Sequence, residues 1–374
     1  MRILLSLTYY LPNISGLTIY SKNLADEFVK LGHEVTILSS QHIKALSLKE
    51  KTNGVMIYRI PVTIRLGKGV IMLSYPIYAL KLVYNTDIIN CHLPQFESSL
   101  LAILGKLFRK KVFVTYHTDL YASGLLNIIS KVFLTISHLV TAILADKIIV
   151  QTEDYVKSSS FLKLFKDKII YIYPPIVLHK YTEKTVRSIG KRIGIKTGYK
   201  IGLVSRLAKE KGVEYLLATI PILSKNLKRD FRIIIVGPNN PVGENDYADK
   251  IKRLISDNSK YVVLFDTVSF EELAALYSCL DVVVLPSINS TEAFGMVQVE
   301  AMLSGVPVVA TDLPGVSVPI KLSGMGETVP VKDTESLAKS IIRVLTINKY
   351  KRQNIKVIFS LKQTIEQYEK TFIS

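Results

Sequence analysis

Short apolar runs alternate with amphipathic segments along almost the whole chain. Each run is rich in Val, Ile and Leu and is bounded by turn-forming or charged residues, which is typical of buried parallel strands. In the first half, the expected strands are residues 3–7, 34–38, 87–91, 112–116, 147–150 and 169–172, with a helix over about 19–30. The alternation restarts with strands 201–204, 233–236, 262–265, 282–285 and 306–311 and helices 213–220, 249–256, 270–278 and 295–303.

Two such series predict an α/β chain of two doubly wound, Rossmann-like domains that face each other across a cleft. The pattern breaks over residues 178–200, which hold many cations and a single acid and are the candidate interdomain linker. We therefore expect domains at residues 1–180 and 181–349. Residues 350–374 are predicted to form one or two helices, for which packing back on the first domain is one option.

The longest apolar stretch, residues 125–145, carries polar residues mostly at multiples of three or four positions. This spacing predicts an amphipathic helix rather than a membrane span. The first residues lack a secretion signal. Two cysteines, Cys91 and Cys279, lie far apart in apolar surroundings. We expect both to be small core residues in a reducing compartment rather than a disulfide or a metal site.

The chain holds 48 Lys and Arg against 31 Asp and Glu, a formal charge of +17, so it attracts polyanions. The basic residues are dispersed, with few aromatic residues between them and no nucleic-acid-binding motif. A small anionic ligand or an anionic membrane surface is therefore favoured over nucleic acid, and a solvated lysine-rich surface without a partner remains an alternative.

Two carboxylates stand out between the strand 282–285 and the strand 306–311. Glu292 is expected at the loop-to-helix junction, with Ser290 or Thr291 as helix cap, at the carboxyl end of a strand where open α/β sheets bind ligands. Glu300 is expected inside the following helix. Carboxylates accept the hydrogen bonds that sugar hydroxyls donate, so the pair fits a polyhydroxylated ligand. A helix-dipole or solvated role for both remains an alternative.

Two cations follow the first strand of the second domain, in the sequence GLVSRLAKEKG. Arg206 offers a planar fork of donors and Lys211 a compact charge, next to a helix start near Gly212. This combination suits a diphosphate whose negative charge grows as it departs. A solvated basic turn is the alternative.

Two histidines mark strand ends in the first domain. His117 follows the strand 112–116, with Asp119 two residues later, and His92 is a weaker candidate at the end of the preceding strand. Gly16 lies in the loop before the first helix, where a backbone could approach a ligand.

Several kinds of chemistry find no support in the sequence. We find no G-x-G-x-x-G fingerprint, no Asp-x-Asp pair, no His and Cys cluster and no serine nucleophile motif. A dehydrogenase is therefore disfavoured, and neither a metal nor another cofactor is expected.

Four blocks in order, GHEV, VTYHTDL, GLVSRLAKEKG and EAFGMVQVE with AMLSGVPVVAT, resemble retaining nucleotide-sugar glycosyltransferases of family 4 with the GT-B fold. The resemblance covers residues 2 to about 333. It implies transfer of a sugar from a nucleotide diphosphate to an acceptor hydroxyl, with retention of anomeric configuration and without a metal. The departing phosphate would receive the acceptor's proton.

The resemblance also implies roles for single residues. Glu292 would contact the donor sugar, and Glu300 would bind the ribose hydroxyls. Arg206 and Lys211 would bind the diphosphate, and His117 would lie beside the anomeric carbon. Backbone N–H groups of Phe294, Gly295 and Met296 would hold sugar hydroxyls and phosphate, and Gly16 would let the loop of the first domain close over the diphosphate.

The sequence therefore predicts a cytoplasmic hexosyltransferase, peripheral on the membrane as one option, with a UDP- or GDP-hexose donor. The expected acceptor is a lipid-linked or membrane-presented glycan, and the apolar, lysine-punctuated residues 65–83 are a candidate membrane contact or, equally, a core segment. The alternatives are a nucleotide-sugar epimerase or glycogen-type synthase of the same fold, and a non-catalytic nucleotide-sugar or polyanion-binding protein.

Overall fold

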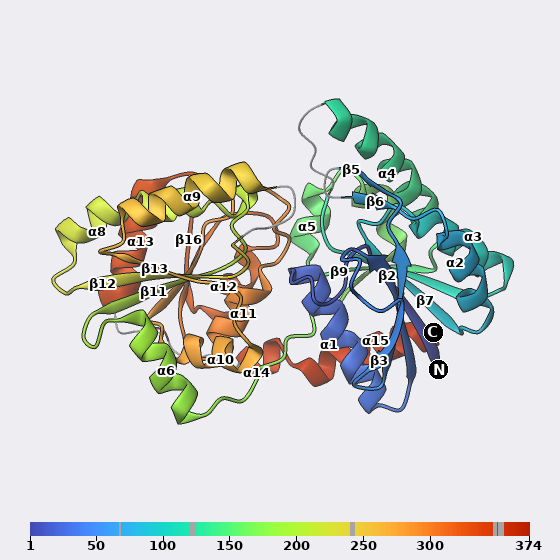
Figure 1. Ribbon diagram of the computed structural model, residues 1–374, viewed down its shortest axis with the longest axis horizontal. Coiled ribbons are helices and arrows are strands. Elements are labelled where there is room, and N and C mark those ends of the chain that lie inside the picture. Colours follow the sequence, from blue (N-terminus) through green and yellow to red (C-terminus); the bar gives the residue numbers. More distant parts are fainter. Residues whose placement is uncertain (67–68, 120–124, 240–243, 347–349, 351–354) are drawn as a thin grey trace. The chain divides into compact units, whose positions relative to one another are not determined.

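The computed structural model describes residues 1–66, 69–119, 125–239, 244–346, 350 and 355–374 (Figure 1). The chain forms two compact units. Unit 1 consists of Met1–Pro175 together with Leu361–Ser374, and unit 2 consists of Ile176–Ser360. The last helix of the chain therefore belongs to the first unit.

Unit 1 is built on a sheet of order β10-β9-β8-β7-β1-β2-β4-β3, in which all pairs are parallel except β3 with β4. Its strands are β1 Arg2–Ser6, β2 Glu34–Gln41, β3 Lys49–Thr52, β4 Val55–Pro61, β7 Ile88–Leu93, β8 Lys111–Tyr116, β9 Lys147–Val150 and β10 Ile169–Tyr171, with a separate hairpin of β5 Ile64–Leu66 and β6 Gly69–Ile71. The order reverses between β1 and β7, and in doubly wound sheets ligands bind at this switch point, outside the carboxyl ends of the strands.

The helices of unit 1 are α1 Gly16–Lys30, α2 Tyr75–Tyr84, α3 Ser98–Leu107, α4 Leu125–Leu144, α5 Glu153–Ser158, the 3-10 segment η1 Leu162–Lys168 and α15 Leu361–Ile373. The aromatic side chains of α15 anchor it to this unit. Tyr368 is fully buried and hydrogen-bonds Tyr20 of α1, and the ring of Phe372 packs against Phe28 and Phe113.

Unit 2 has a parallel sheet of order β13-β12-β11-β14-β15-β16, with its switch point between β11 and β14. Its strands are β11 Tyr199–Val204, β12 Phe231–Val236, β13 Val262–Phe265, β14 Val282–Leu285, β15 Val308–Thr311 and β16 Gly326–Val329. Its helices are α6 Glu183–Ile193, η2 Lys209–Lys211, α7 Val213–Leu217, α8 Ile220–Asn226, α9 Asn245–Asp257, α10 Phe270–Cys279, α11 Met296–Leu303, α12 Ser317–Ser323, α13 Thr334–Thr346 and α14 Ile355–Ile358.

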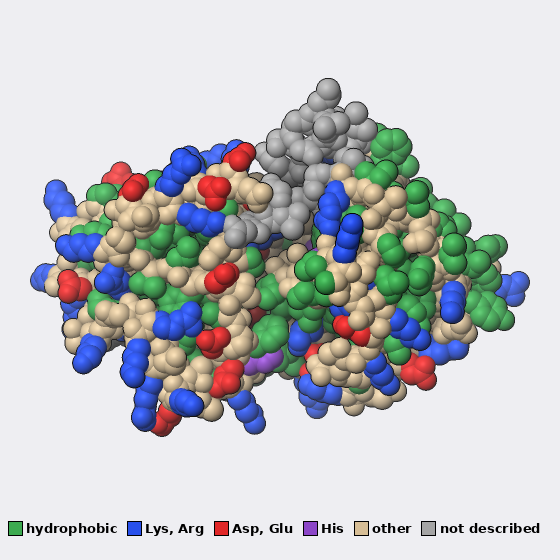
Figure 2. Space-filling model, in the orientation of Figure 1, with side chains coloured by type: hydrophobic (Ala, Val, Ile, Leu, Met, Phe, Trp, Pro, Cys, Tyr) green, Lys and Arg blue, Asp and Glu red, His purple; other side chains and the backbone are tan. Residues whose placement is uncertain are grey.

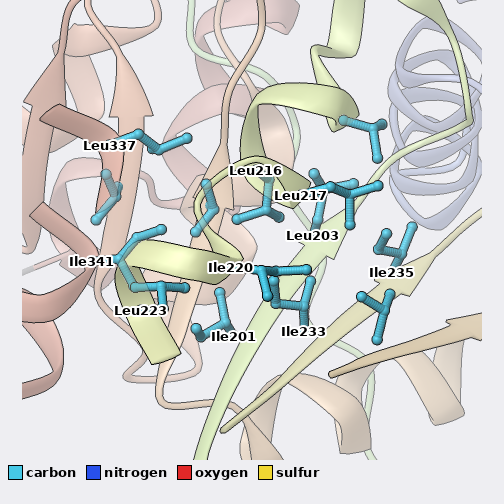
Figure 3. Close-up of a cluster of buried hydrophobic side chains, with 14 of the residues drawn as sticks. Ile201, Leu203, Leu216, Leu217, Ile220, Leu223, Ile233, Ile235, Leu337 and Ile341 are labelled. Atoms are coloured by element: carbon cyan, nitrogen blue, oxygen red, sulfur yellow. The ribbon is translucent and has the colours of Figure 1, made fainter. Parts of the chain in front are cut away.

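Continuous apolar strands form the core of unit 2, because helices cover both faces of the sheet. Alternate residues of β11 and β12 point to one face, where they meet α7, α8 and α13 (Figure 3). The labelled members of this cluster are Ile201, Leu203, Leu216, Leu217, Ile220, Leu223, Ile233, Ile235, Leu337 and Ile341. This packing fixes the carboxyl ends of β11 and β14, from which the candidate site is built.

The predicted α/β class is confirmed, but the predicted linker over residues 178–200 is wrong. Most of it is α6, whose N-cap Thr182 accepts a hydrogen bond from the backbone of Thr185 and whose C-cap Gly194 is left-handed at φ 74°. Only a narrow stripe, with Ile189 and Ile193 buried, faces the core among many charges. Helical periodicity is hard to recognise when the apolar stripe is this narrow.

Helix starts also differ from the predicted ones. Helix α1 begins at Gly16, not near residue 19, because Ser15 caps it through the backbone N–H of Thr18. The predicted helix 213–220 is two helices, α7 and α8, with Pro221 in the first turn of α8, where a missing N–H costs nothing. The predicted helix over residues 125–145 is present as α4. In the described part of the chain, no helix has the length and apolarity that spanning a bilayer requires.

Candidate active site

The loops after β11 and β14 meet at the switch point of unit 2. The backbone N–H of Ile288, after β14, donates to the carbonyl of Glu210, after β11, at 2.9 Å. Gly212 makes this approach possible, since a Cβ there would collide with the carbonyl oxygen of Pro286 and its φ is +62°. Gly212 is predicted from the sequence only as a helix start, and its close approach to the second loop was not predicted.

Lys211 and Glu292 form an ion pair across this junction. Their side chains are 20% and 14% exposed, so the pair is shielded yet within reach of a ligand. The hydroxyl of Ser287, at the end of β14, donates to the same carboxylate oxygen at 3.3 Å. Ser287 is in turn held through its carbonyl, which accepts from Thr311 at 2.7 Å. Two of the predicted site residues therefore touch each other directly.

Arg206 lies on the loop after β11, five residues before Lys211. Its guanidinium pairs with Glu210, which is four residues along the same loop. The guanidinium side chain is 33% exposed and keeps further donors beyond the one used for Glu210. An incoming phosphate would therefore meet an arginine already positioned by an acid.

Helix α11 starts at Gly295 rather than at Ser290 or Thr291, which lie in the loop before it. Gly295 is the N-cap with φ 75°, and a Cβ there would collide with the side chains of Leu285 and Gln298. The buried amide of Gln298 anchors the turn by donating to the carbonyls of Phe294 and Val316. Glu292 consequently lies in the loop before the helix, and the backbone of Phe294, Gly295 and Met296 forms the helix start.

Glu300 lies within α11, as the sequence predicts. Its carboxylate accepts a hydrogen bond of 2.8 Å from the hydroxyl of Tyr277 on α10. Burial raises the pKa of Glu300 above its ordinary value, and the Tyr277 hydrogen bond opposes that rise. The carboxylate has acceptor capacity beyond this one bond, which two vicinal hydroxyls could use.

The predicted histidine of unit 1, His117, follows β8 and stacks on His92 of β7. Their ring centroids are 5.2 Å apart, and Nδ1 of His92 lies 2.9 Å from Nε2 of His117. Ser21 of α1 hydrogen-bonds His92 at 3.1 Å, and the ring of Tyr20 meets His117 edge-on. Burial lowers the pKa of His117 to about 3 and that of His92 well below its ordinary value, so both rings are neutral. His92, the weaker sequence candidate, is the direct partner of His117.

Two expectations for unit 1 need adjustment. Asp119 does not orient His117 through a hydrogen bond, because its carboxylate accepts from the hydroxyls of Tyr116 and Ser159, both at 2.7 Å. Gly16 is the first residue of α1 rather than a loop residue, and a Cβ there would meet no atom within 4 Å. The contribution of α1 to the histidine pair comes from Tyr20 and Ser21 instead.

Metal ligation was not expected from the sequence. Within the described ranges, no three His, Cys, Asp or Glu side chains are grouped so that they could hold an ion. The charged groups described above in unit 2 are the Arg206 guanidinium, the Lys211 ammonium and the carboxylates of Glu210, Glu292 and Glu300. Such a set can bind phosphate oxygens and hydroxyls of one ligand.

Two family descriptions match the chain in succession. Residues 14–180 match Glycosyltransferase Family 4, and residues 187–357 match Glycosyl transferases group 1. The chain belongs to glycosyltransferase family 4. This glycosyltransferase is 29% identical over 363 residues to an uncharacterized glycosyltransferase of Methanocaldococcus jannaschii, covering 92% of this chain and 89% of the relative.

Solved structures share the fold of this glycosyltransferase. HepE of Anabaena, in complex with UDP and glucose, superposes with a TM-score of 0.78 over 100% of both chains at 18% identity. Sucrose-phosphate synthase of Thermosynechococcus elongatus gives a TM-score of 0.75 at 18% identity, over 99% of this chain and 98% of the other. The predicted GT-B fold is therefore confirmed.

Proposed function

We propose that this enzyme is a retaining hexosyltransferase that uses a UDP- or GDP-linked hexose and acts on a hydroxyl of a lipid-linked or membrane-presented glycan. The observation that carries the donor part is the Lys211–Glu292 ion pair beside Arg206 at the switch point of unit 2. A cation paired with an acid there can bind a diphosphate while the acid binds a sugar hydroxyl. HepE, whose fold is shared, is solved with UDP and with UDP-glucose, and this supports a nucleotide-sugar donor.

The proposed reaction balances without an added metal or cofactor. The bond from the anomeric carbon to the β-phosphate oxygen breaks, and a bond to the acceptor oxygen forms on the same face of the sugar. The acceptor's proton passes to the departing phosphate. Arg206 and Lys211 offset the negative charge that grows on that phosphate, which is the task a metal performs in other enzymes.

Other polar groups are proposed to bind the sugar and the ribose of the donor. Glu292 and the backbone at Phe294, Gly295 and Met296 bind the sugar, and Glu300 binds the ribose hydroxyls. His117 is proposed to hydrogen-bond the reacting sugar as a neutral imidazole, and α1 from Gly16 onward supports it. The proposed location is the cytoplasm, at the inner face of the membrane, where a basic protein is attracted to anionic lipid.

The test is a thermal-shift panel of UDP-, GDP- and ADP-hexoses in EDTA, followed by a transfer assay with the donor that binds. A ligand that binds only the folded state increases the free energy of unfolding by about 2.7 kcal/mol at a hundredfold excess over Kd, and Tm rises as a result. We expect one base to be favoured and the product to keep the anomeric configuration of the donor by NMR. An inverted product, or a changed sugar nucleotide without any acceptor, would contradict the proposal, the latter in favour of an epimerase.

A further inference from the structure

Helix α4 turns Ser137, His138 and Thr141 toward the protein, whereas an ordinary surface helix turns such polar side chains toward water. Ser137, His138 and Thr141 are 8%, 1% and 0% exposed. Each is satisfied inside unit 1. The Ser137 hydroxyl donates to the carbonyl of Phe96, His138 accepts from the backbone N–H of Gln95, and Thr141 donates to Ser137. These three polar residues are thus used for packing rather than for contact with water.

The opposite side of α4 is apolar and exposed. Phe133 is 65% exposed, and Val132, Ile136 and Ile143 are each 54% or 55% exposed. A helix normally turns such a stripe toward the core. Here the side chains of the stripe are more than half exposed.

The neighbouring helices α3 and α2 extend this apolar surface. Helix α3 packs against both α4 and α2. Leu107 of α3 is 71% exposed, and Ile77 and Tyr84 of α2 are 73% and 66% exposed. Hydrophobic side chains gather over these helices on the side of unit 1 seen in Figure 2. We call this surface the apolar face; its members are Ile77, Leu80, Tyr84, Ile103, Leu107, Val132, Phe133, Ile136, Leu139 and Ile143.

The charges on these helices have one sign. Helices α2, α3 and α4 carry Lys81, Lys106 and Lys131 and hold no Asp or Glu within their bounds. Arg109 and Lys110 follow directly after α3. A groove beside Lys81 is lined by Ile77, Leu80, Tyr84 and Phe108, so apolar and cationic groups alternate at close range.

A second copy of the chain is a poor occupant for this surface. In a two-fold symmetric dimer, the same cations would face one another, and the neighbouring acid Asp146, two residues after α4, already pairs with Lys106 of its own chain. A bilayer with anionic headgroups matches both the exposed apolar side chains and the positive charge of this surface. Acyl chains surround the apolar side chains, and the headgroups pair with the lysines. Helix α4 would then lie in the interface, as none of the described helices fits a membrane span.

We propose that the apolar face docks the enzyme on an anionic lipid surface. This inference deepens the proposed function, on which it rests for the membrane-presented acceptor, and it assigns the contact to α2, α3 and α4. The sequence suggested residues 65–83, of which 67 and 68 lie outside the described residues. Of that stretch, only residues of α2 belong to the apolar face, and α3 and α4 were not predicted.

Vesicle flotation of the full chain without any sugar donor tests this proposal. The vesicles are phosphatidylcholine alone, or phosphatidylcholine and phosphatidylglycerol in equal parts. We expect recovery with the anionic vesicles at low salt, and at least about tenfold weaker binding for the double variant Ile77→Gln with Phe133→Gln. The matched control, Leu322→Gln with Val357→Gln, removes exposed apolar side chains of unit 2 and is expected to float like the wild type.

Two double variants that reverse lysine charges test the electrostatic part of the contact. Lys81→Glu with Lys131→Glu is expected to weaken anionic-vesicle binding by about thirtyfold or more, whereas Lys184→Glu with Lys191→Glu on α6 leaves it within about twofold. The proposal is overturned if the wild type does not float. It is also overturned if the Ile77→Gln with Phe133→Gln variant and the Lys81→Glu with Lys131→Glu variant both float like the wild type. Self-association that Ile77→Gln with Phe133→Gln abolishes, without any vesicle binding, overturns it in favour of a second copy.

The outcome is separable from that of the proposed function. Transfer to a water-soluble acceptor by Ile77→Gln with Phe133→Gln should equal that of the wild type, because these residues lie outside the assigned site. Absence of transfer with every donor, combined with the expected flotation pattern, would remove the hexosyltransferase proposal and leave the lipid contact standing.

Discussion

Unit 1 and unit 2 place their switch points between corresponding strands, β1 with β7 and β11 with β14, but equip them differently. In unit 2 the point is charged, with the ion pair of Lys211 and Glu292. In unit 1 it is neutral, with two stacked imidazoles whose charged forms burial disfavours. The same backbone arrangement thus supports charge neutralisation in one unit and uncharged hydrogen bonding in the other.

The comparison suggests a division of work. A diphosphate needs fixed positive charge, which Arg206 and Lys211 present at the switch point of unit 2. A sugar hydroxyl needs a donor or acceptor that does not carry charge of its own, which a neutral histidine supplies. The charged groups of unit 2 and the neutral histidines of unit 1 can therefore be tested separately.

The largest effect is expected at Glu292. Glu292→Gln should lower the rate of hexose transfer by about 10²- to 10³-fold, since a preorganised charge beside the reacting sugar is lost. Donor affinity should change only a few-fold. The measurement is kcat with calorimetric donor binding, and Glu335→Gln, an exposed acid of the same unit, is the matched control. An unchanged kcat would remove Glu292 from the reaction.

The next effect concerns Lys211. Lys211→Met should weaken nucleoside diphosphate binding by about ten- to hundredfold, because a charge-assisted contact is lost and Glu292 is left unpaired. Lys209→Met, which removes an exposed lysine two residues away, should bind like the wild type. Equal loss in both variants, measured by calorimetry at fixed salt, would mean that general surface charge rather than the ion pair binds the phosphates.

A smaller effect is expected at Glu300. Glu300→Gln should reduce the preference for a ribonucleotide over its 2′,3′-dideoxy analogue by about three- to tenfold, since an amide accepts hydrogen bonds more weakly than a carboxylate. Tyr277→Phe removes the neighbouring hydrogen bond but keeps the carboxylate, so it should preserve the preference. A preference that Glu300→Gln leaves intact would place the ribose elsewhere.

The smallest effect is a pH dependence of stability in unit 1. Burial lowers the pKa of His138 to about 3, so the unfolded state binds its proton first as the pH falls. The stability from the neutral ring is present above the unfolded pKa of about 6.5 and is lost between about 6.5 and 3. Between about pH 7.5 and 6 the loss should be just under about 1 kcal/mol. His138→Gln should lose less over this interval in urea denaturation, and an identical loss in both proteins would contradict the assignment.

Much of the fold was predictable because buried parallel strands are short apolar runs in sequence. Strand ends also identified Arg206, Lys211 and Glu292 as candidates. The pairing of Lys211 with Glu292, 81 residues apart, was not predictable, because it depends on β11 lying beside β14. Neither was the stacking of His92 on His117, which follows from the pairing of β7 with β8.

Which side of a helix faces the core was also not predictable from the sequence. The periodicity of residues 125–145 identified a helix with a polar side, but periodicity does not state which side faces the core. Two hydrogen bonds decide that for α4: the Thr141 hydroxyl donates to Ser98, and the backbone N–H of Gln95 donates to His138. Narrow apolar stripes, as in α6, were missed for a related reason, since charges dominate the pattern.

The central claim is that fixed cations and acids of unit 2 bind the activated donor without a divalent ion. Calorimetric titration of the wild type with the preferred nucleotide hexose, in EDTA and then in excess Mg²⁺, tests it most directly. The account predicts the same Kd within about twofold under both conditions, since Arg206 and Lys211 supply the charge. Binding that disappears in EDTA and returns with Mg²⁺ would contradict it.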